Sequence, residues 1–342
     1  MHRKNGWYDN MKTINDENIK VSVAVITYNQ EKTIGRAIDS ILEQKTDFRY
    51  EILIADDASS DGTPEILKEY SVRYPDLIKI RLRNKNGGAT KNSYDLFMEA
   101  SGEYIAFLEG DDYWTDRNKL AMQAEFLDLH DEYIGTAGKC NAVNEEGMPL
   151  QDIPGNDRFW EFDNKIFSLA DLCKWKMPSQ IGAVMYRNIY KTILDDYSIL
   201  YRLHPMVGDR TTVMLLTVNG NIYCDKNYVM NYLYRTQGTG NWMSVKMRTN
   251  DRFDDYKLIC DTEKYLREHY HKNIHMYHIR NERIAGAAIS YMMKPDSSKK
   301  EELKNMLRYG GRIIPESCTA VSAVIQKKLH ILAGHSDKRV WV

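Results

Sequence analysis

The chain has 342 residues and a formal net charge of −1 at pH 7, which argues against nucleic acid as its main partner. Hydrophobic residues make up 43% of it, enough to bury a sizeable core in one large domain or two moderate ones. Its five cysteines form no C-x-x-C pair, which predicts reduced thiols in the cytoplasm rather than disulfides or a zinc site. No signal peptide is visible, and the longest apolar-looking stretch, 284–293, is about half the length needed to span a bilayer.

Strand-like and helix-like segments alternate through the first third of the chain. Four short apolar runs have the length and side chains of buried strands, and they cover 21–26, 51–55, 77–82 and 103–108. Each is followed by helical spacing or a helix cap, at 33–42, 63–73, 91–100 and from 115 onward. This alternation predicts an α/β fold with a mostly parallel sheet flanked by helices.

The second half of the chain is less regular. A strand is expected at 181–186, a helix at 207–218, and strands at 221–224 and 228–234. From about 250 the sequence becomes helical and polar, and an apolar stripe over 321–332 predicts a last helix.

Two aspartate pairs stand where predicted strands end. The run 51–55 leads into Asp56 and Asp57, and the run 104–108 leads into 109–112, which reads EGDD. Carboxylates repel one another, so pairing them at strand ends makes sense if a cation or polar ligand binds there. In open α/β sheets, ligands bind at the ends of the strands.

Two common nucleotide-binding motifs are absent. The first strand-to-helix loop, 27–30, reads TYNQ and holds no G-x-G-x-x-G, so the dinucleotide fingerprint is missing. No G-x-x-x-x-G-K-[ST] occurs either, which excludes a P-loop.

At four places the sequence resembles family 2 glycosyltransferases of the GT-A fold. These places are 21–29 (VSVAVITYN), 56–63 (DDASSDGT), 86–92 (NGGATKN) and 109–112 (EGDD). Each motif alone is weak, but four in the right order and spacing are specific. The match is close over 21–125 and looser over 200–242.

The resemblance implies a GT-A-type sheet with a helical C-terminal extension and a division of the chain into four parts. These parts are a polar lead-in (1–20), a donor-binding half (21–125), an acceptor-binding and catalytic half (126–245) and a helical C-terminal region (246–342).

In this family a divalent cation neutralises the diphosphate that leaves with the nucleotide. The resemblance implies that Asp112 is the metal ligand and that Asp111 binds the ribose or the water shell of the metal. Hard oxygen ligands select Mn²⁺ or Mg²⁺. The alternative is a solvated turn or helix cap.

The donor site is implied by the same motifs. Asp57 would accept a hydrogen bond from the base of the donor, which suits the N–H of a uracil-like ring, and Asp56 would orient the loop. Tyr28 either stacks on that base or is a half-buried tyrosine; its neighbours Thr27 and Asn29 belong to the same site.

The glycine loop would complete this site. Gly88, with Gly87, lets the backbone approach the ligand or simply forms a turn. Lys91 is either a cation near the diphosphate or a solvated helix lysine.

The resemblance implies Asp209 as the catalytic base. Inverting transfer needs one carboxylate to deprotonate the acceptor hydroxyl. The family places a Glu-Asp pair at the start of a helix, whereas this chain has Gly208-Asp209. The aspartate is therefore present and its acidic neighbour is lost; the alternative is that Asp209 is a plain helix cap.

Downstream residues are expected at the acceptor site or in a closing loop. Arg235 belongs to a Tyr-Arg pair that closes the catalytic domain in the family, and Gln237 stands where many members have a histidine. Trp242 and Trp114 are either acceptor platforms or buried tryptophans. The Gln-x-x-Arg-Trp signature of processive synthases is missing, which predicts the transfer of one sugar per encounter.

Together these features predict an inverting, metal-dependent, non-processive glycosyltransferase. It would use a nucleoside-diphosphate sugar, with a UDP-sugar favoured, and a glycan or lipid-linked acceptor in bacterial surface polysaccharide assembly. The alternatives are a sugar nucleotidyltransferase, or a nucleotide-sugar-binding protein without activity. From Lys294 to Val342 there are ten Lys/Arg against five Asp/Glu, so this tail either contacts the inner face of the membrane or packs on the domain.

Overall fold

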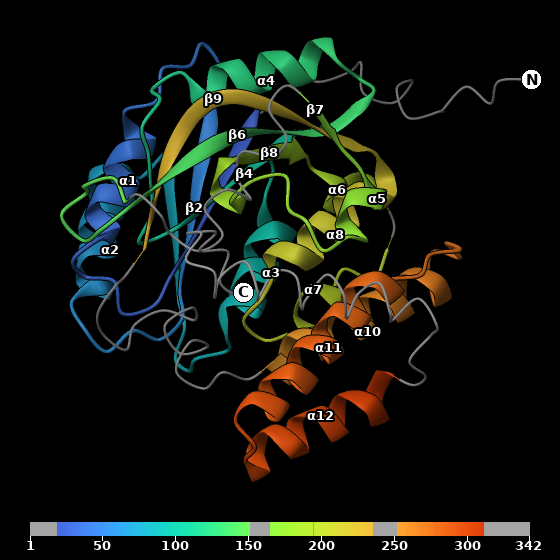
Figure 1. Cartoon of the computed structure of the whole chain (residues 1–342). Coiled ribbons are helices and arrows are strands. Elements are labelled where there is room, and N and C mark those ends of the chain that lie inside the picture. Colours follow the sequence, from blue (N-terminus) through green and yellow to red (C-terminus); the bar gives the residue numbers. More distant parts are fainter. Residues whose placement is uncertain (1–18, 151–164, 194, 235–251, 311–342) are drawn as a thin grey trace, which may run out of the picture.

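A computed structural model describes residues 19–150, 165–193, 195–234 and 252–310. Within these residues one mixed sheet of nine strands runs in the order β3-β2-β1-β4-β8-β6-β9-β5, with β7 paired to β9 (Figure 1). The strands are β1 (Val21–Thr27), β2 (Tyr50–Asp56), β3 (Ile78–Leu82), β4 (Tyr104–Glu109), β5 (Tyr113–Trp114), β6 (Tyr133–Val143), β7 (Lys165–Phe167), β8 (Val184–Arg187) and β9 (Asn221–Leu233). The predicted α/β fold is confirmed.

The four N-terminal strands that the sequence predicted are parallel neighbours. β1 lies between β2 and β4, and β3 pairs with β2 on the outside. All seven residues of β1 are buried, as expected for a central strand covered on both faces. In register, Thr27 lies opposite Asp56, and Ile26 lies opposite Glu109. The carboxyl ends of β1, β2 and β4 therefore meet at one edge of the sheet.

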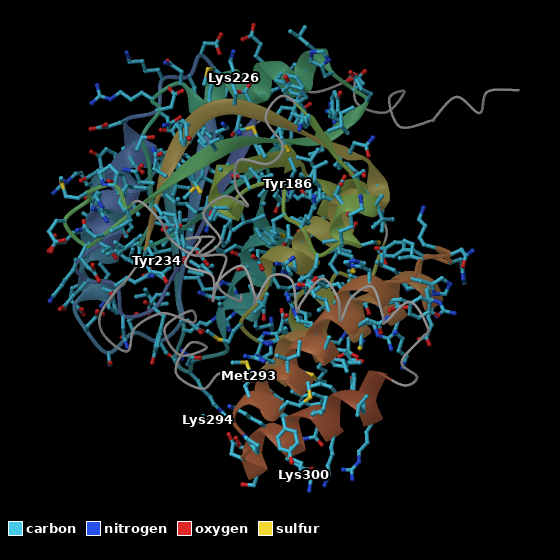
Figure 2. The ribbon with its side chains drawn as sticks, in the orientation of Figure 1. Tyr186, Lys226, Tyr234, Met293, Lys294 and Lys300 are labelled. Carbon is cyan, nitrogen blue, oxygen red and sulfur yellow. The ribbon has the colours of Figure 1, made fainter. Side chains whose placement is uncertain are left out.

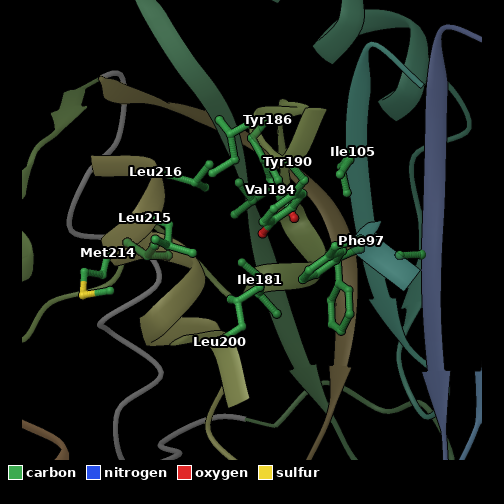
Figure 3. Close-up of a cluster of buried hydrophobic side chains, with 14 of the residues drawn as sticks. Phe97, Ile105, Ile181, Val184, Tyr186, Tyr190, Leu200, Met214, Leu215 and Leu216 are labelled. Carbon is green, nitrogen blue, oxygen red and sulfur yellow. The ribbon is translucent and has the colours of Figure 1, made fainter. Parts of the chain in front are cut away.

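Helices cover both faces of this sheet (Figure 1). One face packs on α1 (Ile34–Leu42), α2 (Thr63–Arg73) and α4 (Lys119–Leu129). The other packs on α3 (Ala89–Glu99), α6 (Ile189–Thr192), α7 (Ile199–Arg202) and α8 (Asp209–Asn219), beside the short helix α5 (Leu169–Leu172). In this second layer Phe97 of α3 stacks on Tyr190 with ring centroids 5.1 Å apart, and Leu215 and Leu216 of α8 face the sheet (Figure 3).

The irregular second half differs from the expectation in detail. The predicted strand at 181–186 is a 3₁₀ turn, Ile181–Ala183, followed by β8. The two strands expected at 221–224 and 228–234 are one long strand, β9. Its exposed residues 226–228 lie at a register shift against β6, which explains why the apolar pattern is interrupted there.

The C-terminal region is helical, as predicted, where the structure describes it. Its helices are α10 (Arg252–Glu268), α11 (Tyr277–Met293) and α12 (Ser297–Gly310). Figure 2 shows Met293 at the end of α11, Lys294 directly after it and Lys300 on α12, well away from Tyr186 in the core. The last helix expected at 321–332 lies outside the described residues. None of the helices described is long and apolar enough to cross a membrane.

A lysine is fully buried where α4 begins. Lys119 is 0% exposed, its Nζ donates to Gln123 Oε1 at 2.7 Å, and it lies 4.3 Å from the centroid of the Trp114 ring. Burial lowers the pKa of Lys119 to about 7, and the charge of Asp116 opposes this only in part.

We expect this lysine to make folding stability rise with pH between about 7 and its ordinary pKa of 10.5. In that window the unfolded chain holds a proton that the folded chain has released, so a rise in pH favours the folded state. Lys119→Met should remove this part of the slope when urea unfolding is measured at several pH values. The exposed Lys85, changed to Met, should leave the slope as it is. Equal slopes for wild type and Lys119→Met would contradict the assignment.

Candidate functional site

A cavity of about 560 Å³ opens where β1, β2 and β4 end, between the sheet edge, α3 and α8. Its walls bring together residues far apart in the sequence, including Tyr28, Asp57, Glu109, Asp111 and Asp209. The strand-end position is where α/β sheets bind ligands. Most of the predicted donor, metal and base residues therefore share one cavity.

Three carboxylates on the cavity wall repel one another. Burial, together with the charges of Asp111 and Asp209, raises the pKa of Glu109 to about 8. Glu109 and Asp111 come from the end of β4, whereas Asp209 is the first residue of α8. Such a cluster is unfavourable by itself and is relieved when a cation binds nearby.

The residues present fit a divalent cation that shares its ligands with a phosphate group. Carboxylate oxygens are the hard ligands that Mn²⁺ and Mg²⁺ prefer. Within the described parts of the chain, no group of three or more His, Cys, Asp or Glu side chains is arranged to hold a metal alone. Mg²⁺ commonly binds through one or two carboxylates plus the phosphates of a substrate, which matches this arrangement.

The structure places Asp112 differently from the sequence-based expectation. This residue is 1% exposed and does not line the cavity. Its Oδ1 accepts a hydrogen bond from the backbone N–H of Leu233 at 2.9 Å, and its Oδ2 accepts one from Gln180 Nε2 at 3.3 Å. Burial and the charges of Asp111 and Glu109 raise its pKa. The geometry thus favours Asp111 over Asp112 as the carboxylate that faces a bound cation.

The second aspartate pair shapes the loops around the cavity. Asp57 accepts from the backbone N–H groups of Gly87 and Gly88, at 2.8 and 2.9 Å. Asp56 accepts from the backbone N–H and the hydroxyl of Ser59 in the loop that follows β2. Because a carboxylate has about four acceptor sites, Asp57 can hold the glycine loop and still accept from a ligand.

The backbone at Gly88 lies close to Pro205, which explains why this position of the loop is a glycine. Gly88 has φ +88°, and a Cβ there would lie 2.8 Å from the carbonyl oxygen of Pro205. A larger residue at this position would both strain the backbone and push Pro205 away. The glycine loop and the segment before α8 are therefore in direct contact.

Of three other residues predicted to bind the donor, two line the cavity and one does not. Tyr28 lines the cavity and is 47% exposed, so part of its side chain is accessible to a ligand. Thr27 also lines it and is buried, and its hydroxyl has no hydrogen-bond partner among the residues that the structure describes. Asn29 does not line it; it has φ +52° and accepts from the backbone N–H of Ser60, so it holds the loop.

Lys91 also lies off the cavity wall. Its Nζ bonds to the carboxylate of Asp95 one helical turn along α3. It lies 4.9 and 5.2 Å from the ring centroids of Tyr94 and Tyr201. These contacts favour a structural role over contact with a diphosphate.

Asp209 lies on the cavity wall at the start of α8, where a carboxylate is stabilised by the helix dipole. Its Oδ1 accepts a hydrogen bond from the adjacent backbone N–H of Arg210, at 2.7 Å. The preceding Gly208 packs against α3, because a Cβ there would lie 3.2 Å from Thr90 Cγ2. A side chain at position 208 would therefore require Thr90 to shift slightly.

Of the residues predicted for the acceptor site and the closing loop, the structure describes Trp114. Trp114 is 4% exposed, and its indole N–H donates to the carbonyl of Gly182 at 2.9 Å. Trp114 is therefore a core residue, and the interpretation that it forms a platform for the acceptor is wrong. Arg235, Gln237 and Trp242 lie outside the described residues.

Two cavity residues were missed by the sequence analysis. Gln180 Nε2 donates to both Glu109 and Asp112, at 3.3 Å each, and so holds the acidic segment in place. Tyr232 of β9 lines the cavity, and burial followed by the charge of Asp112 raises its pKa. Gln180 lies in no motif, and Tyr232 lies in the strand predicted at 228–234 without having been assigned to the site. Both reach the cavity through tertiary folding.

Comparison with known proteins shows the family of this chain. The sequence model described as Glycosyl transferase family 2 matches residues 22–194. An uncharacterized glycosyltransferase of Nostoc sp. is 38% identical over 237 residues, which are 68% of this chain and 70% of that protein. The poly(ribitol-phosphate) beta-glucosyltransferase of Bacillus spizizenii is 33% identical over 134 residues, which are 38% of this chain and 20% of that protein.

A solved structure shares the fold. Residues 1–349 of TarS from Staphylococcus aureus, in complex with UDP-GlcNAc, superpose with a TM-score of 0.62 at 20% identity, covering 94% of this chain and 89% of that one. An uncharacterized protein of Mycobacterium tuberculosis is 36% identical over 189 residues, or 55% of this chain. The chain spans about half the length of that relative, 49%.

Proposed function

Because the chain belongs to glycosyl transferase family 2, we propose that its cavity binds a nucleoside-diphosphate sugar and transfers the sugar to a hydroxyl group of a glycan. A single observation carries this proposal. Tyr28 and Asp57, which would bind the nucleobase, line the same cavity as Glu109 and Asp111, which would face the cation and the phosphates. Asp209, the candidate catalytic base, lines it too.

The donor would lie along the sheet edge. Tyr28 offers a ring face to the nucleobase, and Asp57 offers a carboxylate oxygen to its N–H. Relatives support UDP as the nucleotide, because TarS has been crystallised with UDP-GlcNAc. A cation beside Asp111 and Glu109 would supply charge neutralisation for the departing diphosphate.

Asp209 would act as the base for the acceptor. Its carboxylate takes the proton of the acceptor hydroxyl as that oxygen bonds to the anomeric carbon. The bond from the anomeric carbon to the diphosphate oxygen breaks, and the nucleoside diphosphate leaves with the bonding electrons. Attack opposite the leaving group inverts the anomeric configuration.

The acceptor that fits this proposal best is a polyol-phosphate or glycan of the bacterial surface. Relatives named poly(ribitol-phosphate) beta-glucosyltransferase and poly(ribitol-phosphate) beta-N-acetylglucosaminyltransferase support a surface polymer. We include in the proposal a non-processive transfer at the inner face of the membrane, with the basic C-terminal tail near anionic lipid.

The test is a transfer assay with the full chain. UDP-GlcNAc and UDP-glucose are each incubated with Mn²⁺ and poly(ribitol phosphate), and released UDP and the modified polymer are measured. We expect UDP release that depends on the acceptor, and a β-linked product identified by NMR. Pyrophosphate release from UTP and a sugar phosphate would instead indicate a nucleotidyltransferase, and tight UDP binding without turnover would indicate a binding protein.

A further inference from the structure

The segment between α7 and α8 carries part of the cavity wall and ends at the candidate base. We call residues 204–208 the base loop. Met206, Val207 and Gly208 of this loop line the cavity, and Asp209 follows directly. How this short loop is held therefore decides where the Asp209 carboxylate lies.

A buried histidine holds the base loop from within. His204 Nδ1 lies 3.0 Å from the backbone nitrogen of Met206 and 2.9 Å from that of Val207. Both backbone groups are donors, so Nδ1 accepts and carries no proton. The ring proton is then on Nε2, which donates to Asp254 Oδ2 at 2.7 Å.

Asp254 belongs to the first turn of α10, in the C-terminal helical region. The side chain of His204 is 7% exposed, so its ring is enclosed between the base loop and α10. On its other side, the base loop bonds to α3 through Pro205, whose carbonyl accepts from the backbone N–H and the hydroxyl of Thr90, at 3.3 and 2.9 Å. The base loop is thus fixed between the donor half and the C-terminal helices.

We propose that His204 is a positioning residue for Asp209, and that α10 acts through it as part of the active-site scaffold. This inference rests on the proposed function in that it takes Asp209 as the base. It assigns a role in transfer to the helical C-terminal region, where no motif points to the site. His204 touches no substrate; it fixes the base loop by satisfying two backbone donors and is itself fixed by Asp254.

The test uses full-length variants and two readouts. His204→Ala should lower kcat for transfer from UDP-GlcNAc to poly(ribitol phosphate) about 10- to 100-fold, because small misplacements of a catalytic group are costly. The KM for UDP-GlcNAc should stay nearly unchanged, because Tyr28 and Asp57 are untouched. In hydrogen exchange, the amides of the base loop should exchange about tenfold faster or more, since their acceptor is lost.

Conservative variants separate positioning from general destabilisation. His204→Asn keeps an acceptor near the Nδ1 position and should recover most of the kcat and of the amide protection. Asp254→Asn keeps the shape of the side chain but weakens its hydrogen bond with His204 Nε2. It should lower kcat and amide protection less than His204→Ala does. The matched control is His269→Ala, which removes another histidine–aspartate pair, His269 with Asp195 at 2.6 Å, away from the cavity. It should change neither readout.

Unchanged kcat and exchange in His204→Ala would overturn the inference, as would an equal loss in His269→Ala. If the wild-type chain transfers no sugar, the proposed function fails, and the exchange measurement decides the inference alone. Unchanged exchange in the base loop would then refute it, and faster exchange confined to 204–208 would support it.

Discussion

Asp209→Asn is expected to abolish most sugar transfer while leaving UDP binding in place. Asparagine has the shape of aspartate but cannot take a proton, and loss of a general base costs about 10²- to 10⁴-fold in rate. The charge of Asp209 is one of the two that raise the pKa of Glu109 by repulsion, and the substitution removes this charge from the cavity wall. Binding of the donor should therefore not weaken. The measurements are kcat from UDP release and the Kd of UDP with Mn²⁺ from calorimetry.

The control for this prediction is Asp76→Asn. Asp76 is exposed and lies just before β3, at the amino end of the parallel strands and so at the opposite edge of the sheet from the cavity. It should leave both values unchanged. Wild-type turnover in Asp209→Asn would move the base to another carboxylate of the cavity, with Glu109 and Asp111 as the alternatives.

Asp111→Asn is expected to remove the metal-dependent part of donor binding. A ligand at about 100 times its Kd stabilises the folded state by about 2.7 kcal/mol, which thermal unfolding detects readily. For the wild-type chain, UDP with Mn²⁺ should raise Tm more than UDP alone. In Asp111→Asn the two shifts should be equal, because the carboxylate that lines the cavity has become a neutral amide.

The matched variant is Asp112→Asn, the next residue along the chain. Its amide would put a donor against Gln180 Nε2, where the carboxylate now accepts, and such a loss costs about 1–3 kcal/mol. We expect a lower Tm without ligand but an intact metal-dependent shift. The reverse pattern, with the metal effect lost in Asp112→Asn and kept in Asp111→Asn, would restore Asp112 as the metal ligand.

Local sequence patterns predicted the four parallel strands of the first third and the position of the site at their ends. The β-branched run at 21–26 and the apolar runs that follow it predict buried parallel strands, because a strand covered on both faces has no polar face to alternate. Carboxylates directly after two such strands then predict a polar site at their shared edge. The cavity lies there, and it includes Asp57 and Asp111.

Only the tertiary structure decided that Asp111, and not Asp112, faces the cavity. Asp112 is turned inward by a backbone N–H 121 residues away, at Leu233, and by Gln180, 68 residues away. No sequence window contains those partners. The buried position of Trp114 has the same origin, since its indole N–H donates to Gly182, also 68 residues away.

The sequence by itself determined the four parallel strands of the first third, the helices that follow them and the strand-end carboxylates, because these depend on side-chain periodicity over a few neighbouring residues. The tertiary structure decided how Asp209 reaches the carboxylates of β4, and how His204 joins the base loop to α10. These depend on hydrogen bonds and packing between residues distant in the chain, because a side chain takes its direction from whichever partner satisfies its polar atoms.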